Sequence, residues 1–238
     1  MKKELLNKLI SIRRQIHANP EIGYQERDTA DLICRELDVL GIPYRKNIAR
    51  TGVVALLEKG NGPCIALRAD MDALPIKEEN NFEFKSTKKI KIANGSDIPL
   101  MHACGHDMHV AILLGAAALL KEADFKGSVK FIFQPSEEDV NDDPEHKSGG
   151  QRIVEAGELT NVKAALALHM HPLLPVGKVA YKLGQALACA GFFRIEVIGK
   201  MAHASVAPQL GIDAVLIASQ LIQSVSALVP KYTSPTEA

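Results

Sequence analysis

The chain has 238 residues, of which 47% are hydrophobic and 24% are charged, a composition typical of globular proteins rather than disordered ones. Its 28 basic and 28 acidic residues give a formal net charge of zero, which argues against broad electrostatic binding to nucleic acid or to an anionic membrane. No apolar stretch is long enough to span a bilayer, and the charged N-terminus does not resemble a signal peptide. The four cysteines are too widely spaced to indicate a dense disulfide framework. We therefore expect a reduced, cytoplasmic protein with neither nucleic acid nor membrane as a partner.

The first 70 residues predict two helices followed by two strands. Apolar residues recur at helical spacing from Leu5 to Ile16, and Pro20 ends this first helix. A second helix is expected from about residue 26 to residue 40, where Gly41 gives a stop signal. Short apolar runs at 52–57 and 64–67 are bounded by glycine and proline and predict strands.

The next hundred residues continue the alternation of helix and strand. We expect a buried helix at 110–120, a strand at 128–133, a short helix around 153–156 and a buried strand at 164–168. The alanines of this last run favour a helix by propensity alone. The alternation predicts an α/β fold with a mixed, mostly parallel sheet covered by helices on both faces.

The pattern changes after residue 181. Phe193, Ile195 and Val197 alternate with neighbours on the opposite face, which predicts a half-exposed strand, and an amphipathic helix is expected at 212–228. We place a domain boundary near 182–190. The chain would then comprise a domain at 1–183 and, at 184–238, the start of a smaller α+β domain that is too short to bury a good core alone.

Metal-ligand residue types gather in four short segments, three of which follow predicted strands. They are Asp70 and Asp72 in ALRADMDALP, His102, Cys104, His106 and His109 in MHACGHDMH, Glu137, Glu138 and Asp139 in FQPSEED, and His169 and His171 in LHMHP. Functional groups of an open α/β sheet gather beyond the carboxyl ends of its strands, so these groups are expected to converge. Cysteine, histidine and carboxylate bind zinc and neighbouring divalent metals. The convergence predicts a metal site.

Each group also has an alternative explanation in which it takes no part in metal binding or catalysis. An isolated cysteine is often a small packing residue, and adjacent glutamates are usually solvated. We expect packing roles for Cys34, Cys64 and Cys189, and structural or exposed positions for His17, His109, His146 and His171. A metal site still accounts best for all the strand-end groups together. In FQPSEED one glutamate can bind metal while its neighbour serves as a base, and Cys104 is a candidate bridge between two ions.

The strings RRQIHANPEIGYQE, ALRADMDALPI, MHACGHDMH, FQPSEED, LHMHPLLPVG and GKMAHAS follow one another in this order along the chain. Together they resemble the M20 metallopeptidase family, and within it the amidohydrolase branch of N-acyl-amino-acid amidohydrolases, hippurate hydrolases, auxin-conjugate hydrolases and related carboxypeptidases. The resemblance implies metal-dependent hydrolysis of the amide bond of an N-acyl amino acid or a small peptide-like conjugate by activated water.

The resemblance also assigns roles to single residues. It implies that Cys104, His106, Glu138 and His169 are ligands of two divalent ions, which are Zn, Mn, Co or Ni. Glu137 would be the general base, and Asp72 would support the metal site. His203 lies in the segment that resembles a lid domain; there it would approach the substrate and steady the oxyanion. A homodimer through that lid is a further expectation.

Two departures from the family pattern remain. Met201 and Ala202 replace two glycines before His203. Family members are also longer, so the resemblance implies that the rest of the lid and a later ligand histidine lie outside these 238 residues. A second expectation is therefore a truncated metal-binding fragment without turnover of its own.

Overall fold

The computed structural model describes residues 2–91, 95–138, 143–184 and 193–232, and residues 229–232 by their backbone alone. The chain divides into two compact units, Met1–Pro172 and Leu173–Ala238. The boundary expected near 182–190 falls largely outside the described residues, so the domain limits 1–183 and 184–238 remain a prediction. Within the described ranges, no helix combines the length and the apolar character needed to cross a membrane.

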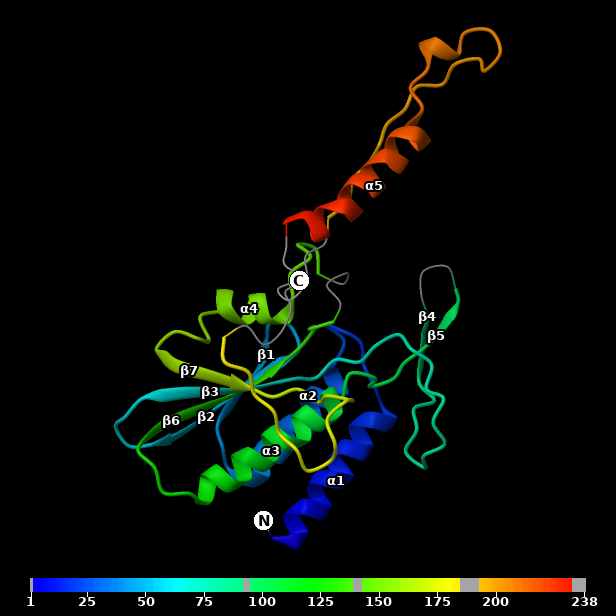
Figure 1. The fold of residues 1–238 in the computed structure, drawn as a ribbon. Coiled ribbons are helices and arrows are strands. Elements are labelled where there is room, and N and C mark those ends of the chain that lie inside the picture. The colour runs from blue at the N-terminus through cyan, green and yellow to red at the C-terminus, as the bar shows by residue number, and fades with distance from the viewer. Residues whose placement is uncertain (1, 92–94, 139–142, 185–192, 233–238) are drawn as a thin grey trace. The chain divides into compact units, whose positions relative to one another are not determined.

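A five-stranded sheet forms the centre of the first unit (Figure 1). Its strands lie in the order β1-β2-β6-β3-β7, with bounds Tyr44–Ile48, Gly52–Lys59, Gly127–Gln134, Cys64–Asp70 and Val162–Ala167. The pairs β1–β2 and β2–β6 are antiparallel, whereas β3–β6 and β3–β7 are parallel. The predicted mixed sheet is confirmed, although parallel pairs do not outnumber antiparallel ones among the described strands.

Helices cover both faces of this sheet, as expected from the apolar strands. Figure 1 shows α1 (Lys3–Ala18), α2 (Arg27–Leu40) and α3 (His106–Glu122) on one side and α4 (Gly149–Glu155) on the other. Successive residues of one strand serve opposite faces: Phe131 joins the larger core with the first three helices, and Ile132 packs with Ile153 of α4. This alternation follows from the two-residue period of a strand.

The predicted helices and strands of the first unit are confirmed, with shifted ends. Gly41 ends α2 in the left-handed conformation, at φ 62°. Helix α3 begins at His106, several residues before the apolar run that predicted it, because its first turn is made of polar residues. The sequence did not predict β1 or the small sheet of β4 (Lys89–Lys91) and β5 (Asp97–Pro99), whose residues are largely polar.

The apolar run at 164–168 is a strand, but its expected burial is wrong. Strand β7 is exposed along almost its whole length, with Leu166 at 56%. It occupies an end of the sheet, where pairing with β3 over-rides the helix propensity of its alanines. A strand in the middle of a sheet has a neighbouring strand along each edge. Within the described residues, β7 has such a neighbour along one edge only, which leaves it more exposed.

The second unit contains the short 3-10 helix η1 (Pro208–Leu210) and helix α5 (Ala214–Tyr232). Helix α5 confirms the helix predicted at 212–228, and the carboxylate of Asp213 accepts the backbone N–H groups of Val215 and Leu216 at its start. The strand predicted around Phe193, Ile195 and Val197 is wrong. A strand needs a pairing partner, and the described part of this unit holds only an isolated bridge between Lys200 and Ile212.

Candidate metal centre

The carboxyl ends of the three parallel strands bring the predicted site together, as the sequence predicted. Asp70 ends β3 and Asp72 follows it, Glu137 and Glu138 follow β6, and His169 follows β7. The N-terminus of α3, together with the chain segment that precedes it, lies at the same place. Residues far apart in the sequence therefore meet where functional groups of such sheets are usually found.

A sharp turn at Gly105 sets the direction in which α3 begins. Gly105 precedes the helix in the left-handed conformation, with φ 89°. A Cβ atom at this position would lie 2.9 Å from Cγ of Met170, so both the backbone angle and the available space favour glycine. The turn presents Cys104 on one side and His106 on the other to a shared centre.

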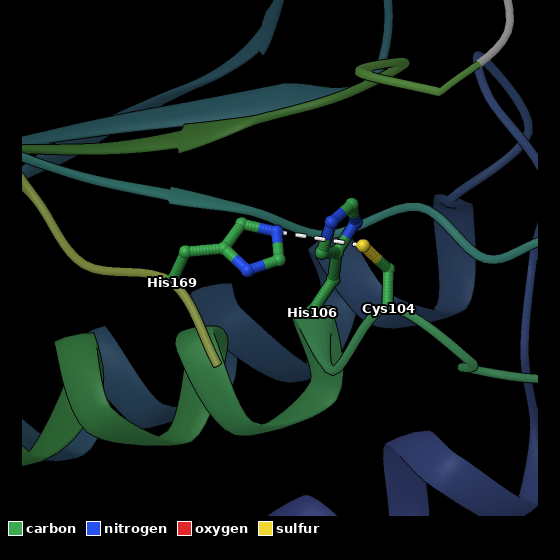
Figure 2. A group of neighbouring side chains, drawn as sticks. All are labelled: Cys104, His106 and His169. Carbon is green, nitrogen blue, oxygen red and sulfur yellow. Dashed lines mark hydrogen bonds between the residues drawn. The ribbon is translucent and has the colours of Figure 1, made fainter. Parts of the chain in front are cut away.

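Cys104, His106 and His169 form one candidate ligand group, shown in Figure 2. One ligand atom from each lies within 4.8 Å of the others. The closest pair is Sγ of Cys104 and Nε2 of His169, which are 3.4 Å apart. Thiolate and imidazole at this separation suit zinc and neighbouring divalent metals.

His106 is the member that joins this group to the glutamates. Ligand atoms of His106, Glu137 and Glu138 also lie within 4.8 Å of one another. Nδ1 of His106 contacts the backbone oxygen of Asp72 at 2.9 Å and its Oδ1 at 3.1 Å. These acceptors fix the proton on Nδ1 and leave the lone pair of Nε2 directed at the centre.

Two buried atoms at the centre have no hydrogen-bond partner among the described residues. They are Nε2 of His106 and Oε1 of Glu138, which are 3.8 Å apart. Unsatisfied buried polar atoms are costly and uncommon, and each demands an explanation. A divalent cation between them would satisfy both, so the donor set of this centre fits a metal.

Asp72 also holds the loop that carries the two glutamates. Its Oδ2 accepts the backbone N–H groups of Glu137 at 2.8 Å and Glu138 at 2.9 Å. Its carboxylate therefore ties that loop to His106. On the other side of the same loop, buried Glu26 accepts the backbone N–H of Ser136 at 2.8 Å.

Carboxylates dominate the electrostatics of the centre. Burial, a hydrogen bond to Glu138 and the surrounding negative charges raise the pKa of the Cys104 thiol to about 12. Partial loss of hydration and the charges of Glu138 and Asp70 raise the pKa of Glu137 above its ordinary value. Concentrated negative charge of this kind favours a bound cation.

Asp70 and His109 contribute contacts that the sequence did not assign. His109, expected to be structural or exposed, is buried with Nδ1 2.5 Å from Oδ1 of Asp70. Burial favours the neutral form of Asp70, but the hydrogen bond to His109 and the charge of Arg68 outweigh it and lower the pKa of Asp70 to about 2. The spacing of His106 and His109 on one helix face was the available signal.

His17 is structural, as expected, and it too has carboxylate partners. It is buried with Nδ1 2.7 Å from Asp107 and Nε2 3.1 Å from Glu78. The bond to Asp107 is the main influence that raises the pKa of His17, against the opposing effect of burial. The pair ties α1 to the first turn of α3, directly beside His106.

The remaining sequence predictions concern residues outside these ligand groups. His146 and His171 are exposed, Cys34 is buried and Cys64 is half-buried. His203 belongs to the second unit, where Ser205 donates its backbone N–H to Nδ1 of His203 at 3.3 Å. Asp139 and Cys189 lie outside the described residues.

Comparison with known proteins identifies relatives of this chain. The chain is similar to IAA-amino acid hydrolase ILR1-like 2 of Arabidopsis thaliana, with 44% identity over 98% of this chain and 50% of that protein. It is also similar to the N-acetyl-L-cysteine deacetylase of Bacillus subtilis (strain 168), with 39% identity over 98% of this chain and 53% of that protein. The chain thus spans about half the length of the curated relatives it matches.

A solved structure and a family model give the same result. The YXEP protein of Bacillus subtilis, described as a dinuclear metal binding peptidase from M20 family, matches with a TM-score of 0.64 and 40% identity. That match covers 74% of this chain and 46% of the other. The model of peptidase family M20/M25/M40 matches residues 66–237. With its ordered motifs, its mixed sheet and this match, the chain belongs to peptidase family M20/M25/M40.

Proposed function

We propose that the protein hydrolyses the amide bond of N-acyl amino acids or small peptide-like conjugates, and that Cys104, His106, Glu138 and His169 hold the divalent metal it requires. The observation that carries the proposal is the position of His106. His106 is common to the cysteine–histidine group and to the glutamate group, and its buried Nε2 has no hydrogen-bond partner among the described residues. The names of the similar amino acid hydrolase and deacetylase support the reaction class.

The chemistry divides between the metal and the protein. When bound, a divalent ion acidifies a water molecule and polarises a carbonyl oxygen. Glu137 accepts the proton of the attacking water and then delivers it to the departing amine nitrogen. Its raised pKa suits both steps, because a general acid–base group works best with a pKa close to the working pH.

Two further residues have proposed roles around this reaction. Asp72 keeps the imidazole of His106 and the glutamate loop in place through the hydrogen bonds described above. His203 would contact the substrate and stabilise negative charge on the carbonyl oxygen. Its hydrogen bonds to Ser205 leave Nε2 available for such a contact.

We propose two ions per site, with Cys104 as the bridging ligand and Zn, Mn, Co or Ni as the metal. The likeness to a dinuclear M20 peptidase supports the number of ions, and the mixed donor set suits all four metals. We also propose that the protein works in the cytoplasm, which the scattered free thiols support.

A homodimer through the second unit is proposed as well. Many large apolar side chains of this unit are exposed, among them Phe193 at 72%, Ile198 at 82% and Val215 at 79%. Exposed apolar side chains gathered in one region mark interaction surfaces. Sedimentation equilibrium of the chain should show a dimer whose dissociation constant rises when Ile198 and Val215 are replaced by serine. A monomer at all concentrations would contradict this proposal.

A second candidate function is metal binding without turnover. Ligand atoms of Cys104, His106 and His169 lie within 4.8 Å of one another, and this favours a role in which these residues hold metal without catalysing a reaction. Metal analysis and hydrolysis assays on the same sample separate the two functions. Metal with turnover supports the amidohydrolase, metal without turnover supports the second function, and absence of metal contradicts both.

The role of Glu137 is tested by replacing it with glutamine. In metal-loaded protein assayed on N-acetyl, N-benzoyl and dipeptide substrates, E137Q should retain the metal and lose turnover by about 100-fold or more, the usual size of a general acid–base contribution. E145Q, which alters an exposed glutamate away from the centre, is the control and should match the parent. Full turnover by E137Q would remove Glu137 from the mechanism.

A further inference from the structure

The backbone N–H and the backbone carbonyl of Met170 each form a hydrogen bond with a different histidine. Its N–H donates to Nε2 of His109 at 2.9 Å, and its carbonyl oxygen lies 2.7 Å from Nδ1 of His169. Met170 thereby connects a buried imidazole of α3 to an exposed imidazole of the candidate metal centre.

These contacts determine where the proton of each imidazole lies. A backbone N–H can only donate, so Nε2 of His109 must be an acceptor and its proton must be on Nδ1. That proton is donated to Oδ1 of Asp70, 2.5 Å away. Asp70 is itself held by Nη1 of Arg68 at 2.7 Å. His109 is therefore locked in one tautomer and one orientation.

The same reasoning fixes His169. A carbonyl oxygen can only accept, so Nδ1 of His169 carries the proton that it donates to Met170. Its Nε2 then acts as an acceptor, and this is the atom that is hydrogen-bonded to Sγ of Cys104 at 3.4 Å. The tautomer required of a metal ligand at Nε2 is thus selected by the Met170 carbonyl.

Packing alone does not fix this orientation, because the residue is exposed. His169 follows the end of an exposed strand, and its ring meets the rings of His106 and His109 edge-on, with centroids 5.9 Å and 4.8 Å away. H109Q lacks the ring of His109 but can keep both hydrogen bonds, so it separates this ring contact from the bonds. The segment is fastened instead at Met170, which is half-buried with its side chain close against Gly105. The hydrogen bond from the backbone N–H of Met170 to His109 is the second attachment. His109 lies about one helical turn after His106 on α3.

We propose that His109 is a positioning residue, held by Asp70, that orients His169 toward the metal through the backbone of Met170. The proposal rests on the metal site proposed above and extends it to a buried histidine that contacts no substrate. Partners of this kind in other metal sites change metal affinity by about 10-fold to 100-fold when they are removed.

Two substitutions of His109 test the proposal. H109L keeps the apolar bulk but removes both hydrogen bonds. H109Q restores them, because the glutamine amide can donate to Asp70 and its oxygen can accept from Met170. V110A removes buried volume from the same helix and leaves both bonds intact, so it controls for loss of stability.

The first readout is cobalt binding by the 238-residue chain, followed through the thiolate-to-cobalt absorption band and the dissociation constant. We expect H109L to weaken binding about tenfold or more and to alter the band, whereas H109Q and V110A stay within about threefold of the parent. Unchanged cobalt binding by H109L, or an equal loss in V110A, would overturn the proposal.

The second readout needs no metal and works even if H109L does not fold. Hydrogen exchange of the Met170 amide and nitrogen chemical shifts of His109 are measured in the metal-free parent. The proposal requires a protected amide and a proton on Nδ1; rapid exchange or the opposite tautomer would overturn it. A protected amide in a parent that binds no cobalt would instead contradict the proposed metal site and leave the hydrogen-bonded chain from Asp70 to His169 intact.

Discussion

Single residues of this protein act through backbone geometry as much as through their side-chain chemistry. The sequence was sufficient to predict that Cys104, His106, Glu138 and His169 would converge, because Glu138 and His169 follow predicted strands and Cys104 and His106 precede a predicted helix. It could not predict the contacts that orient these ligands. The expected support from Asp72 reaches His106 through both its backbone oxygen and its carboxylate, and Met170 contacts His169 through its backbone oxygen. A main-chain contact leaves no pattern in the sequence.

Gly105 gives the sharpest test at this scale. G105A adds a Cβ in a left-handed backbone conformation and against Met170, so we expect a loss of about 1–3 kcal/mol in the free energy of unfolding. G60A is the matched control: Gly60 also has a positive φ, of 78°, but nothing lies within 4 Å of an added Cβ. Urea unfolding of both variants compares the strain with and without the contact.

The effect on metal separates the two glycines further. G105A should also weaken metal binding. To make room for the added Cβ, both the turn that presents Cys104 and Met170, the neighbour of His169, must shift. G60A should leave it unchanged. Equal stability and equal metal affinity in the two variants would show that the contact between residue 105 and Met170 is unimportant.

Glu26 predicts a pH dependence of stability. Burial is the main reason that its pKa is raised, to about 7, against the lowering effect of its hydrogen bonds to Thr51 and Ser136. Between the ordinary pKa of about 4.5 and about 7, the unfolded chain loses this proton while the folded chain keeps it. This group therefore reduces the free energy of unfolding as the pH rises, by about 3 kcal/mol across that window.

The measurement compares the parent with E26Q in the absence of metal. Chemical unfolding is followed from pH 4 to pH 8, and the difference between the two proteins cancels the contributions of all other groups. E26Q should gain stability relative to the parent as the pH rises, with most of the change below about pH 7. A difference that is independent of pH would contradict the raised pKa.

At the scale of elements, strand pairing and packing determine whether a segment forms a strand where the local sequence pattern is ambiguous. The run at 164–168 is alanine-rich, yet it forms β7 because β3 offers a parallel partner. The alternating run from Phe193 to Val197 forms no strand because the described residues offer it none. Periodicity predicts which face of an element is apolar, but pairing depends on chain segments far away in sequence.

Helix α3 carries both core residues and the first site residues, so its packing is open to a direct test. Leu114 is buried at 2% and Leu119 is exposed at 49% on the same helix. L114A should lower the free energy of unfolding by about 2–5 kcal/mol, through lost burial and the cavity left behind. L119A should cost much less. Similar losses in the two variants, measured by denaturant unfolding, would contradict the described packing of α3.

At the scale of the whole molecule, the fold class was predictable from the sequence, and the domain limits 1–183 and 184–238 remain a prediction. Helices and apolar strands alternating along the chain indicated a covered sheet, and the structure confirms it. The composition change after residue 181 marked a different kind of segment, whereas the compact units divide at Pro172 and Leu173. Unit boundaries depend on the sum of contacts between distant segments, which local composition does not contain.

The account depends most on the claim that Cys104 shares a metal with His106, Glu138 and His169. X-ray absorption at the zinc edge of the zinc-loaded chain tests it directly, because sulfur scatters differently from nitrogen and oxygen. The account predicts a sulfur ligand among nitrogen and oxygen ligands, lost in C104S and retained in C64S. Zinc without a sulfur ligand in the parent, or a sulfur ligand that persists in C104S, would contradict it.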